Sequence, residues 1–527
     1  MKQQKLLCNS LAVTKHKAKP KIAVVLLALV GLVGASALPA QGAGPAVASG
    51  KTESTTRYEM GPKTNFYSVK SKAKVSTKTQ RATNPFGDNT STTRTVNSTK
   101  TDPKTNVVTQ EITEIAVTKK IDKTVTVTKQ ITEVKTPLKA KQATGTPIKI
   151  GWITDASSIT KSTYFPEYEG AGLFFKTLNA HGGVNGHPIE ILMQDMKIDQ
   201  AVAVTAANKL LKEDNVLMLA VSTLEGRLPA LFDVARSVSA PILTGHSARP
   251  DMFPTNADPL LFSVGNVFEA MSDARVQLWP QMFGKLFPNG GTSACYIHDA
   301  PAAVAVCNRW LDEQAKATPQ WRPGVIAKAP LSASDFTSYV RPVVDSNPTV
   351  FFDISIASHA VGVAVAARNL GYRGPIAFSM TATPETEIRT VAQRVGGDNL
   401  YAVSNVASID ERTIPEVRQV VAAAKTYGKE LPASSATING WIMGQVIADS
   451  VTRCGDNCTR QGMRDSMEKL SLDVSGIFGG LLQYGPGDHI GKRYWTGYRW
   501  DVRKRKLVRL VPGWSTFSPE DLRIPIK

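Results

Sequence analysis

The sequence predicts an α/β fold with doubly wound parallel sheets. From residue 147 onward, short apolar runs alternate with longer stretches of helical periodicity. Apolar runs of this length between turn residues indicate strands. Strands that alternate with helices form a parallel sheet covered by helices. A chain of 527 residues exceeds one ordinary domain, so more than one folded unit is expected.

The first β-α-β unit carries the strongest pattern. We predict a strand at 148–153, a polar loop, a helix at 167–180 and a second strand at 189–194. Gly182-Gly183-Val184-Asn185-Gly186 follows the helix, and glycines at a helix end allow the chain to turn back. The connection is therefore expected to be a crossover between parallel strands.

The same alternation continues to about residue 400. Further strands are expected at 216–221, 240–244, 293–298, 349–355 and 375–379. Further helices are expected at 200–212, 225–238, 268–286, 301–316, 334–345, 359–370, 385–395, 414–428, 436–453 and 459–469. A strand-rich tail is predicted to complete the chain.

The sequence of the first β-α-β unit resembles that of one protein family. Residues 169–190 read E-G-A-x-L-x-x-x-x-L-N-A-x-G-G-V-N-G-x-P-I-E. This stretch resembles the type I periplasmic solute-binding proteins of branched-chain amino acid ABC transporters, the leucine-binding-protein-like branch. Supporting matches follow in the same order along the chain, at 206–210, 240–244, 367–372 and 440–441.

The resemblance implies two doubly wound parallel-sheet lobes joined by a three-crossing hinge, with a ligand in the cleft between them. Carried over, lobe one covers 147–266 and 405–475, and lobe two covers 267–404 and 476–527. It also implies an ABC transporter permease as partner.

The N-terminal residues indicate export. Lysines precede the apolar run 22–33, and Ala35-Ser36-Ala37 is a plausible cleavage site. We predict a signal peptide at 1–37 and therefore a location in the periplasm or outside the cell. The alternative is an uncleaved membrane anchor, for which the charge-free run 22–37 is short.

A Thr/Lys-rich segment, 38–146, separates this leader from the lobes. It is poor in large apolar side chains, so we predict a disordered spacer. Strand-like alternation at 112–117 and 125–128 also allows a loose hairpin.

Charge is concentrated in this N-terminal part. Residues 51–145 contain 18 Lys and Arg against 8 Asp and Glu, whereas 146–527 contain 38 against 36. The lobes are nearly neutral, which argues against a nucleic-acid partner. Membrane contact is expected only through a transporter or this basic spacer.

Four cysteines follow the leader: Cys295, Cys307, Cys454 and Cys458. An even number suits disulfides in an oxidising compartment, in the pairs 295/307 and 454/458. Buried thiols are the alternative for the first pair. Neither pair has a second ligand pair with metal spacing, so no metal site is predicted.

The first candidate site follows the strand at 216–221. Ligands of open parallel sheets bind at the carboxyl ends of strands. Ser222 and Thr223 stand there, and their hydroxyls with free N–H groups suit an oxygen-rich ligand. The alternative is an ordinary helix N-cap. The resemblance favours a ligand contact.

The second candidate is the loop after the strand at 240–244. It offers His246, Ser247 and Arg249, with Ala248 where the family's amino-acid binders carry a threonine. Arg249 suits a bidentate carboxylate contact and His246 a neutral donor. The alternatives are a solvated arginine and a histidine that supports the loop from behind.

The expected contacts of an amino-acid ligand are missing from the sequence. The family's acid aligns with Met380 and its aromatic residue with Ala302. A buried ammonium without an anion costs several kcal/mol. An apolar or aromatic solute, with or without one carboxylate, is therefore expected. Further contacts are predicted from Ser158, Tyr164, Phe268 and Ser355.

Motifs of hydrolases, metalloproteases and nucleotide-binding enzymes are absent from the sequence. We therefore predict a binding protein without catalytic residues or cofactor, serving an ABC importer. Two alternatives remain: an extracellular sensing or envelope-attached module without transport, and an amidase-like regulator or enzyme that would turn its ligand over.

Overall fold

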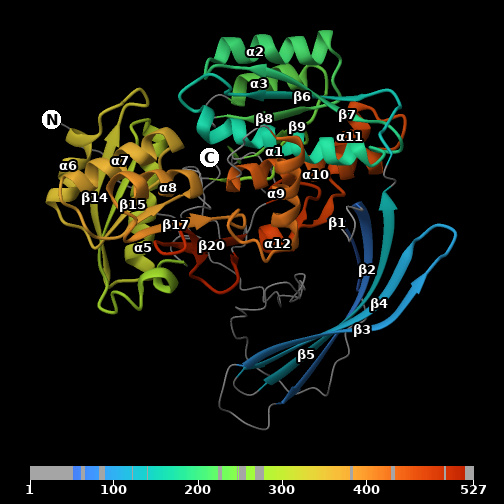
Figure 1. The fold of residues 1–527 in the computed structure, drawn as a ribbon, viewed down its shortest axis with the longest axis horizontal. Coiled ribbons are helices and arrows are strands. Elements are labelled where there is room, and N and C mark those ends of the chain that lie inside the picture. Colours follow the sequence, from blue (N-terminus) through green and yellow to red (C-terminus); the bar gives the residue numbers. More distant parts are fainter. Residues whose placement is uncertain are drawn as a thin grey trace, which may run out of the picture.

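The computed structural model describes most of the chain after residue 50 (Figure 1). The described residues are 51–60, 66–81, 89–120, 123–138, 141–223, 228–245, 247–248, 257–267, 278–379, 384–428, 434–491 and 494–516. The predicted leader, 1–37, lies outside them.

Lobe one is built around a parallel five-stranded sheet of order β11-β9-β8-β6-β7. Its strands are β6 (Ile148–Thr154), β7 (Ile189–Asp195), β8 (Leu219–Ser222), β9 (Ile242–Thr244) and β11 (Leu261–Ser263). Its helices are α1 (Lys161–Ala180), α2 (Gln200–Asn208), α3 (Leu228–Arg236), α9 (Pro415–Tyr427), α10 (Ser435–Cys454) and α11 (Arg460–Met467), with a π-helical turn at Lys209–Glu213.

Lobe two is built around a larger sheet of order β14-β13-β15-β16-β17-β20-β21. Its parallel strands are β13 (Gly291–His298), β14 (Trp321–Ala329), β15 (Val350–Asp353), β16 (Ile376–Phe378) and β17 (Leu400–Ser404); β20 (Tyr494–Asp501), β21 (Lys506–Arg509) and β22 (Ser515–Thr516) join antiparallel. Its helices are α5 (Pro301–Ala317), α6 (Thr337–Asp345), α7 (Ala357–Asn369) and α8 (Pro384–Val395).

These two sheets confirm the predicted α/β fold with parallel-sheet lobes. All seven predicted strands are present. Helix α1 begins at Lys161 rather than near residue 167, so Tyr164 lies in its first turns and not in the preceding loop. The exact lobe boundaries remain a prediction.

The glycine turn after α1 forms as its sequence indicates. Gly182, Gly183 and Gly186 have positive φ, and a Cβ on Gly183 would lie 2.1 Å from the carbonyl oxygen of His187. Asn179 closes the turn, because its amide both donates to and accepts from the backbone of Ile189. The first crossover is thus fixed at both ends.

Helices α1 and α10 lie unusually close together. A Cβ on Gly170 would lie 2.0 Å from the carbonyl oxygen of Thr437, and a Cβ on Gly440 would lie 1.9 Å from that of Glu167. Only glycine allows this approach. A large apolar core that includes Trp441 and Phe174 fills the rest of the contact.

The lobes are joined by several short contacts between the crossing segments. The backbone of Ser263 pairs with His489 and Gly491, and the imidazole Nδ1 of His489 lies 2.8 Å from the carbonyl oxygen of Leu261. His489 is buried and stacks on Phe262. His489 therefore has a structural role where the crossing segments join the lobes.

A buried carboxylate on α8 forms a second joint. Glu385 of α8 accepts hydrogen bonds from the hydroxyl of Ser408 (2.9 Å) and from the hydroxyl (2.9 Å) and backbone N–H (3.2 Å) of Ser435. Because Ser435 begins α10, one side chain of lobe two fixes the start of a helix of lobe one.

The N-terminal segment differs from the prediction. Residues expected to form a disordered spacer form the strands β1 (Lys51–Met60), β2 (Phe66–Arg81), β3 (Asn89–Thr101), β4 (Val108–Lys120) and β5 (Lys123–Leu138). They build an antiparallel sheet of order β1-β2-β5-β4-β3, which we call the arm. The β4–β5 pair is the hairpin that the alternation allowed.

The arm is attached to lobe one at the third crossing. Strand β1 pairs with β18 (Ser471–Asp473), which pairs with β19 (Leu481–Gln483) beyond the short helix α12 (Ser475–Phe478). Tyr58 and Phe66 pack on Phe174 of α1. From there the long strands extend away from both lobes (Figure 1). Two aromatic side chains and one strand pairing thus join the arm to lobe one.

Candidate functional site

A polar cluster lies where the strands of lobe one end. Asp155 follows β6 and is fully buried. Its carboxylate accepts hydrogen bonds from the hydroxyls of Thr160 and Thr223, both at 2.9 Å, and from the N–H of Ile198 at 2.6 Å. These partners come from the loops after β6, β7 and β8. Asp155 therefore fixes three loops, and burial raises its pKa.

Thr223, which is predicted to contact a ligand, also supports the site. Its hydroxyl donates to Asp155, so it holds the loop after β8 in place. Ser222, the last residue of β8, is also buried, but its hydroxyl has no hydrogen-bond partner among the described residues. The hydroxyl of Thr154, its register neighbour on β6, is likewise unpaired. Buried polar atoms without partners are rare and require an explanation.

The loop before α1 is held by its own hydrogen bonds. Asp195, at the end of β7, accepts from the N–H of Ala156 at 2.9 Å and from the hydroxyl of Ser157. The Ser158 hydroxyl lies 2.7 Å from that of Thr160. Ser158 therefore lies in the predicted region, but its hydroxyl forms a hydrogen bond within the turn.

Lobe two contributes a buried carboxylate at the end of β15. The hydroxyl and N–H of Ser355 both donate to Oδ1 of Asp353, whereas Oδ2 is buried without a partner among the described residues. Burial raises the pKa of Asp353 to about 7. Tyr296 is close enough for the carboxylate to raise the pKa of its phenol further, although burial is the larger cause.

The two groups of residues meet where α1 and α7 begin. The N–H of Ala357, in the first turn of α7, donates to the hydroxyl of Thr163 on α1 at 3.0 Å. Ser355 precedes Ala357 by two residues in lobe two, and the buried Tyr164 directly follows Thr163 in lobe one. The structure therefore brings Ser158, Tyr164 and Ser355 to one interlobe region, with Ser222 at a strand end of lobe one.

Other predicted site residues cannot be placed. His246, Arg249, Phe268 and Met380 lie outside the described residues. Ser247 belongs to the two-residue strand β10 (Ser247–Ala248), which pairs with β12 (Asn266–Val267), but its side chain also lies outside them.

The sequence interpretation missed the acids of this region. Asp155 and Asp353 each follow an apolar strand directly, in the runs Ile153-Thr154-Asp155 and Phe351-Phe352-Asp353. An acid at that place in a parallel sheet points to the edge where ligands bind. A third buried acid, Glu167 on α1, accepts a hydrogen bond from the amide of Asn439 on α10.

Both predicted disulfides are present. Cys295 of β13 is bonded to Cys307 of α5, and Cys454 is bonded to Cys458 beyond the end of α10. The first joins a helix to the sheet that it covers, and the second closes a small surface loop. Among the described residues no group of three or more acidic, histidine or cysteine side chains suits a metal ion.

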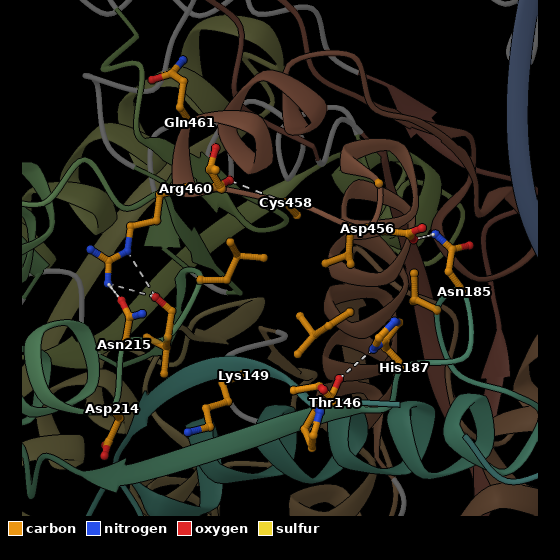
Figure 2. Close-up of a pocket in the computed structure, with 18 residues that line it drawn as sticks. Thr146, Lys149, Asn185, His187, Asp214, Asn215, Asp456, Cys458, Arg460 and Gln461 are labelled. Carbon is orange, nitrogen blue, oxygen red and sulfur yellow. Dashed lines mark hydrogen bonds between the residues drawn. The ribbon is translucent and has the colours of Figure 1, made fainter. Parts of the chain in front are cut away.

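A pocket of about 850 Å³ lies elsewhere on lobe one, near the amino ends of β6 and β8. Figure 2 shows Lys149, His187, Asp456 and Arg460 around it. The guanidinium of Arg460 donates to the carbonyl oxygens of Leu211 and Val216. Arg460 therefore holds the wall of the pocket together.

Residues 147–506 match the sequence model of a protein family, whose description is periplasmic binding protein. Comparison with curated proteins finds no match. None of the helices in the described ranges is both long and apolar enough to cross a bilayer.

Several solved structures are similar to this one. A fatty acid ABC transporter substrate-binding protein from Thermomonospora curvata is 17% identical, with a TM-score of 0.60 over 73% of this chain and 96% of that chain. A leucine-binding protein, LivK, from Thermotoga maritima is 16% identical, with a TM-score of 0.56 over 71% and 99%. The branched-chain amino acid transporter substrate-binding protein LivJ from Streptococcus pneumoniae, in complex with isoleucine, is 16% identical, with a TM-score of 0.58 over 70% and 99%.

These findings confirm the resemblance seen in the sequence. The matched region includes both lobes and leaves out the arm. The chain belongs to the periplasmic binding protein family, whose members are exported binding proteins rather than enzymes.

Proposed function

We propose that this chain is the extracytoplasmic substrate-binding component of an ABC importer. It binds a small apolar or aromatic solute, with or without one carboxylate, in the cleft between the lobes. Ligand contacts to both lobes favour the closed arrangement, which is then presented to the permease. Neither catalysis nor a cofactor is part of this function.

The single observation that carries the proposal is the buried, unpaired hydroxyl of Ser222 at the end of β8. Leaving a buried donor without a partner costs about 1–3 kcal/mol. A ligand that accepts from Ser222 removes this cost. The neighbouring Thr154 hydroxyl offers a second donor to the same ligand.

The ligand class follows from the residues around the cleft. Ala248, Ala302 and Met380 stand where the family's amino-acid binders use polar, aromatic and acidic contacts. Asp353 supplies an acid, but with a pKa of about 7 it is half protonated at neutral pH. The protonated form donates a hydrogen bond to a carboxylate, and the ionised form accepts one from an amine. It therefore does not require a cationic ligand.

A thermal-shift screen of the full chain tests this proposal. The panel contains α-amino acids including isoleucine, aromatic acids, fatty acids and neutral apolar compounds, because one similar structure is named for fatty acids and another holds isoleucine. We expect the largest rise in Tm from an aromatic or aliphatic acid. Equal stabilisation by isoleucine would contradict the ligand class.

A binding module that is attached to the envelope without transport is the second candidate. It is favoured by the ordered arm, which the family match does not cover. Uptake of the identified ligand by cells with and without this protein distinguishes the importer component from the attached binding module. Loss of uptake on deletion supports transport, and unchanged uptake supports the attached module.

A further inference from the structure

The arm carries charge in a pattern that neither lobe shows. Residues 51–145 hold 18 basic and 8 acidic residues, whereas the rest of the chain after them is nearly balanced. In a strand, alternate residues point to opposite faces of the sheet. The register of the arm therefore decides which charges share a face.

One face of the arm collects lysines. Lys70, Lys72 and Lys74 alternate along β2 and lie on the same face. The cross-strand pairs Lys70–Val134, Val134–Thr109 and Thr109–Lys100 place Lys100 on that face as well. All four are exposed, and no ion pair within 4.0 Å joins any of them to a carboxylate of the described residues. Lys70, at the base of the arm, is near enough to the buried Asp449 of α10 for its charge to lower the pKa of that carboxylate, although burial is the larger effect and raises it. We call this the lysine face.

The opposite face holds most of the described acids of the arm, and they are paired. Glu133 is bound by Arg57 (2.6 Å) and Arg94 (3.2 Å), and Glu59 by Lys135 (2.9 Å). On the lysine face the described strand side chains include one acid, Glu111, which accepts a hydrogen bond from Ser98. The two faces thus differ in net charge, and the excess positive charge is not neutralised within the arm.

The chemistry of the lysine face indicates its partner. Lysines on alternate residues of one strand are about 6.7 Å apart, a spacing that suits successive phosphates of a flexible chain. Serine and threonine residues lie beside the lysines on the same face: Ser68 and Ser76 flank the three lysines of β2, and Thr132 is opposite Lys72 on β5. Such hydroxyls donate to phosphate oxygens as lysines do.

Other polyanions fit this face less well. No aromatic ring is exposed among the described side chains of the arm, so bases of a single-stranded nucleic acid have nothing to stack on. Among the described side chains of this face, Ile115 is the one large apolar group that is exposed, which is too little for insertion into a membrane. We propose that the lysine face binds a linear polyphosphodiester without bases, such as a poly(glycerol phosphate) chain.

Binding of poly(glycerol phosphate) to the full chain, measured at several salt concentrations, tests this inference. We expect the variant K70Q/K72Q/K74Q/K100Q to bind at least tenfold more weakly and to show a smaller salt dependence, because each neutralised phosphate releases counterions. The matched control is K212Q/K285Q/K316Q/K425Q, which removes four exposed lysines of the lobes. It should bind as the parent does.

Equal weakening in both variants, or tighter binding to oligo-dT or phosphatidylglycerol vesicles than to poly(glycerol phosphate), would overturn the inference. The variant with four Lys→Arg changes on the lysine face should retain binding, which separates charge from misfolding. The result is independent of the proposed cleft ligand, because a thermal shift with that ligand should be the same in all variants.

Discussion

Asp353 shows how one residue links the sequence to the candidate site. It ends an apolar strand, Val350-Phe351-Phe352-Asp353, and its carboxyl group is fully buried. The type and place of this residue are visible in the sequence. Its environment is not, because burial depends on α7 and on lobe one, which packs against the start of α7.

Asp353→Asn tests the ionisation of this group. Burial raises its pKa to about 7, whereas in the unfolded chain it stays near 3.8. Between these values the folded protein holds a proton that the unfolded chain has lost, so the free energy of unfolding falls as the pH rises from about 4 to 7. The variant should lose this pH dependence, which amounts to a total change in the free energy of unfolding on the order of 4 kcal/mol at most.

Urea unfolding at pH 5 and pH 8 measures this pH dependence. The exposed Asp312→Asn serves as control and should behave as the parent does. If Asp353→Asn keeps the parent's pH dependence, Asp353 does not titrate as described.

Ser222→Ala and Thr223→Val should separate ligand binding from stability. Ser222 has a buried hydroxyl without a partner, so its removal should not lower the free energy of unfolding of the ligand-free protein, and it should weaken ligand binding roughly tenfold. Thr223→Val removes a donor to the buried Asp155 and should destabilise by about 1–3 kcal/mol. Chemical denaturation of the two variants gives the free energy of unfolding, and ligand titration gives the affinity. The reverse pattern would assign the ligand contact to Thr223.

At the scale of elements, the sequence predicted regular strands better than element ends. The start of α1 was placed too late because Pro166 and the aromatic residues around it suggest a loop. Strand β14 was missed because it contains Pro323 and Gly324, which an edge strand tolerates. The arm was missed because its strands are stabilised by pairing over 10 to 16 residues rather than by large apolar side chains.

The contact between α1 and α10 gives a sharp prediction. Gly170→Ala and Gly440→Ala each place a Cβ within 2.0 Å of a backbone carbonyl oxygen, so the helices must separate. We expect a loss of about 1–3 kcal/mol or more. Gly172→Ala lies on the same helix with nothing within 4 Å and should gain about 0.5–1 kcal/mol. Thermal melting of the three variants decides whether the packing is this close.

At the scale of the whole molecule, the order of helices and strands predicted two parallel-sheet lobes. The contacts that join them involve residues far apart in the sequence, such as Glu385 with Ser435, and no local pattern marks them. The same holds for the arm, whose pairing with β18 links residue 56 to residue 472.

Glu385→Gln tests the joint between α8 and α10. The amide cannot accept all four hydrogen bonds that the carboxylate receives from Ser408, Ile409 and Ser435. We expect a loss of about 1–3 kcal/mol and weaker ligand binding, because the hinge no longer holds the start of α10. The exposed Glu190→Gln is the control. An unchanged melting temperature would show that the hydrogen bonds of Glu385 do not stabilise the protein.

A crystal structure of the full chain with the solute that raises its Tm most tests the central claim directly. The account predicts the solute between the lobes, in contact with Ser222 of lobe one and within reach of Asp353 or Ser355 of lobe two. A solute bound in the pocket beside Lys149 and Arg460, with the interlobe region unchanged, would contradict it.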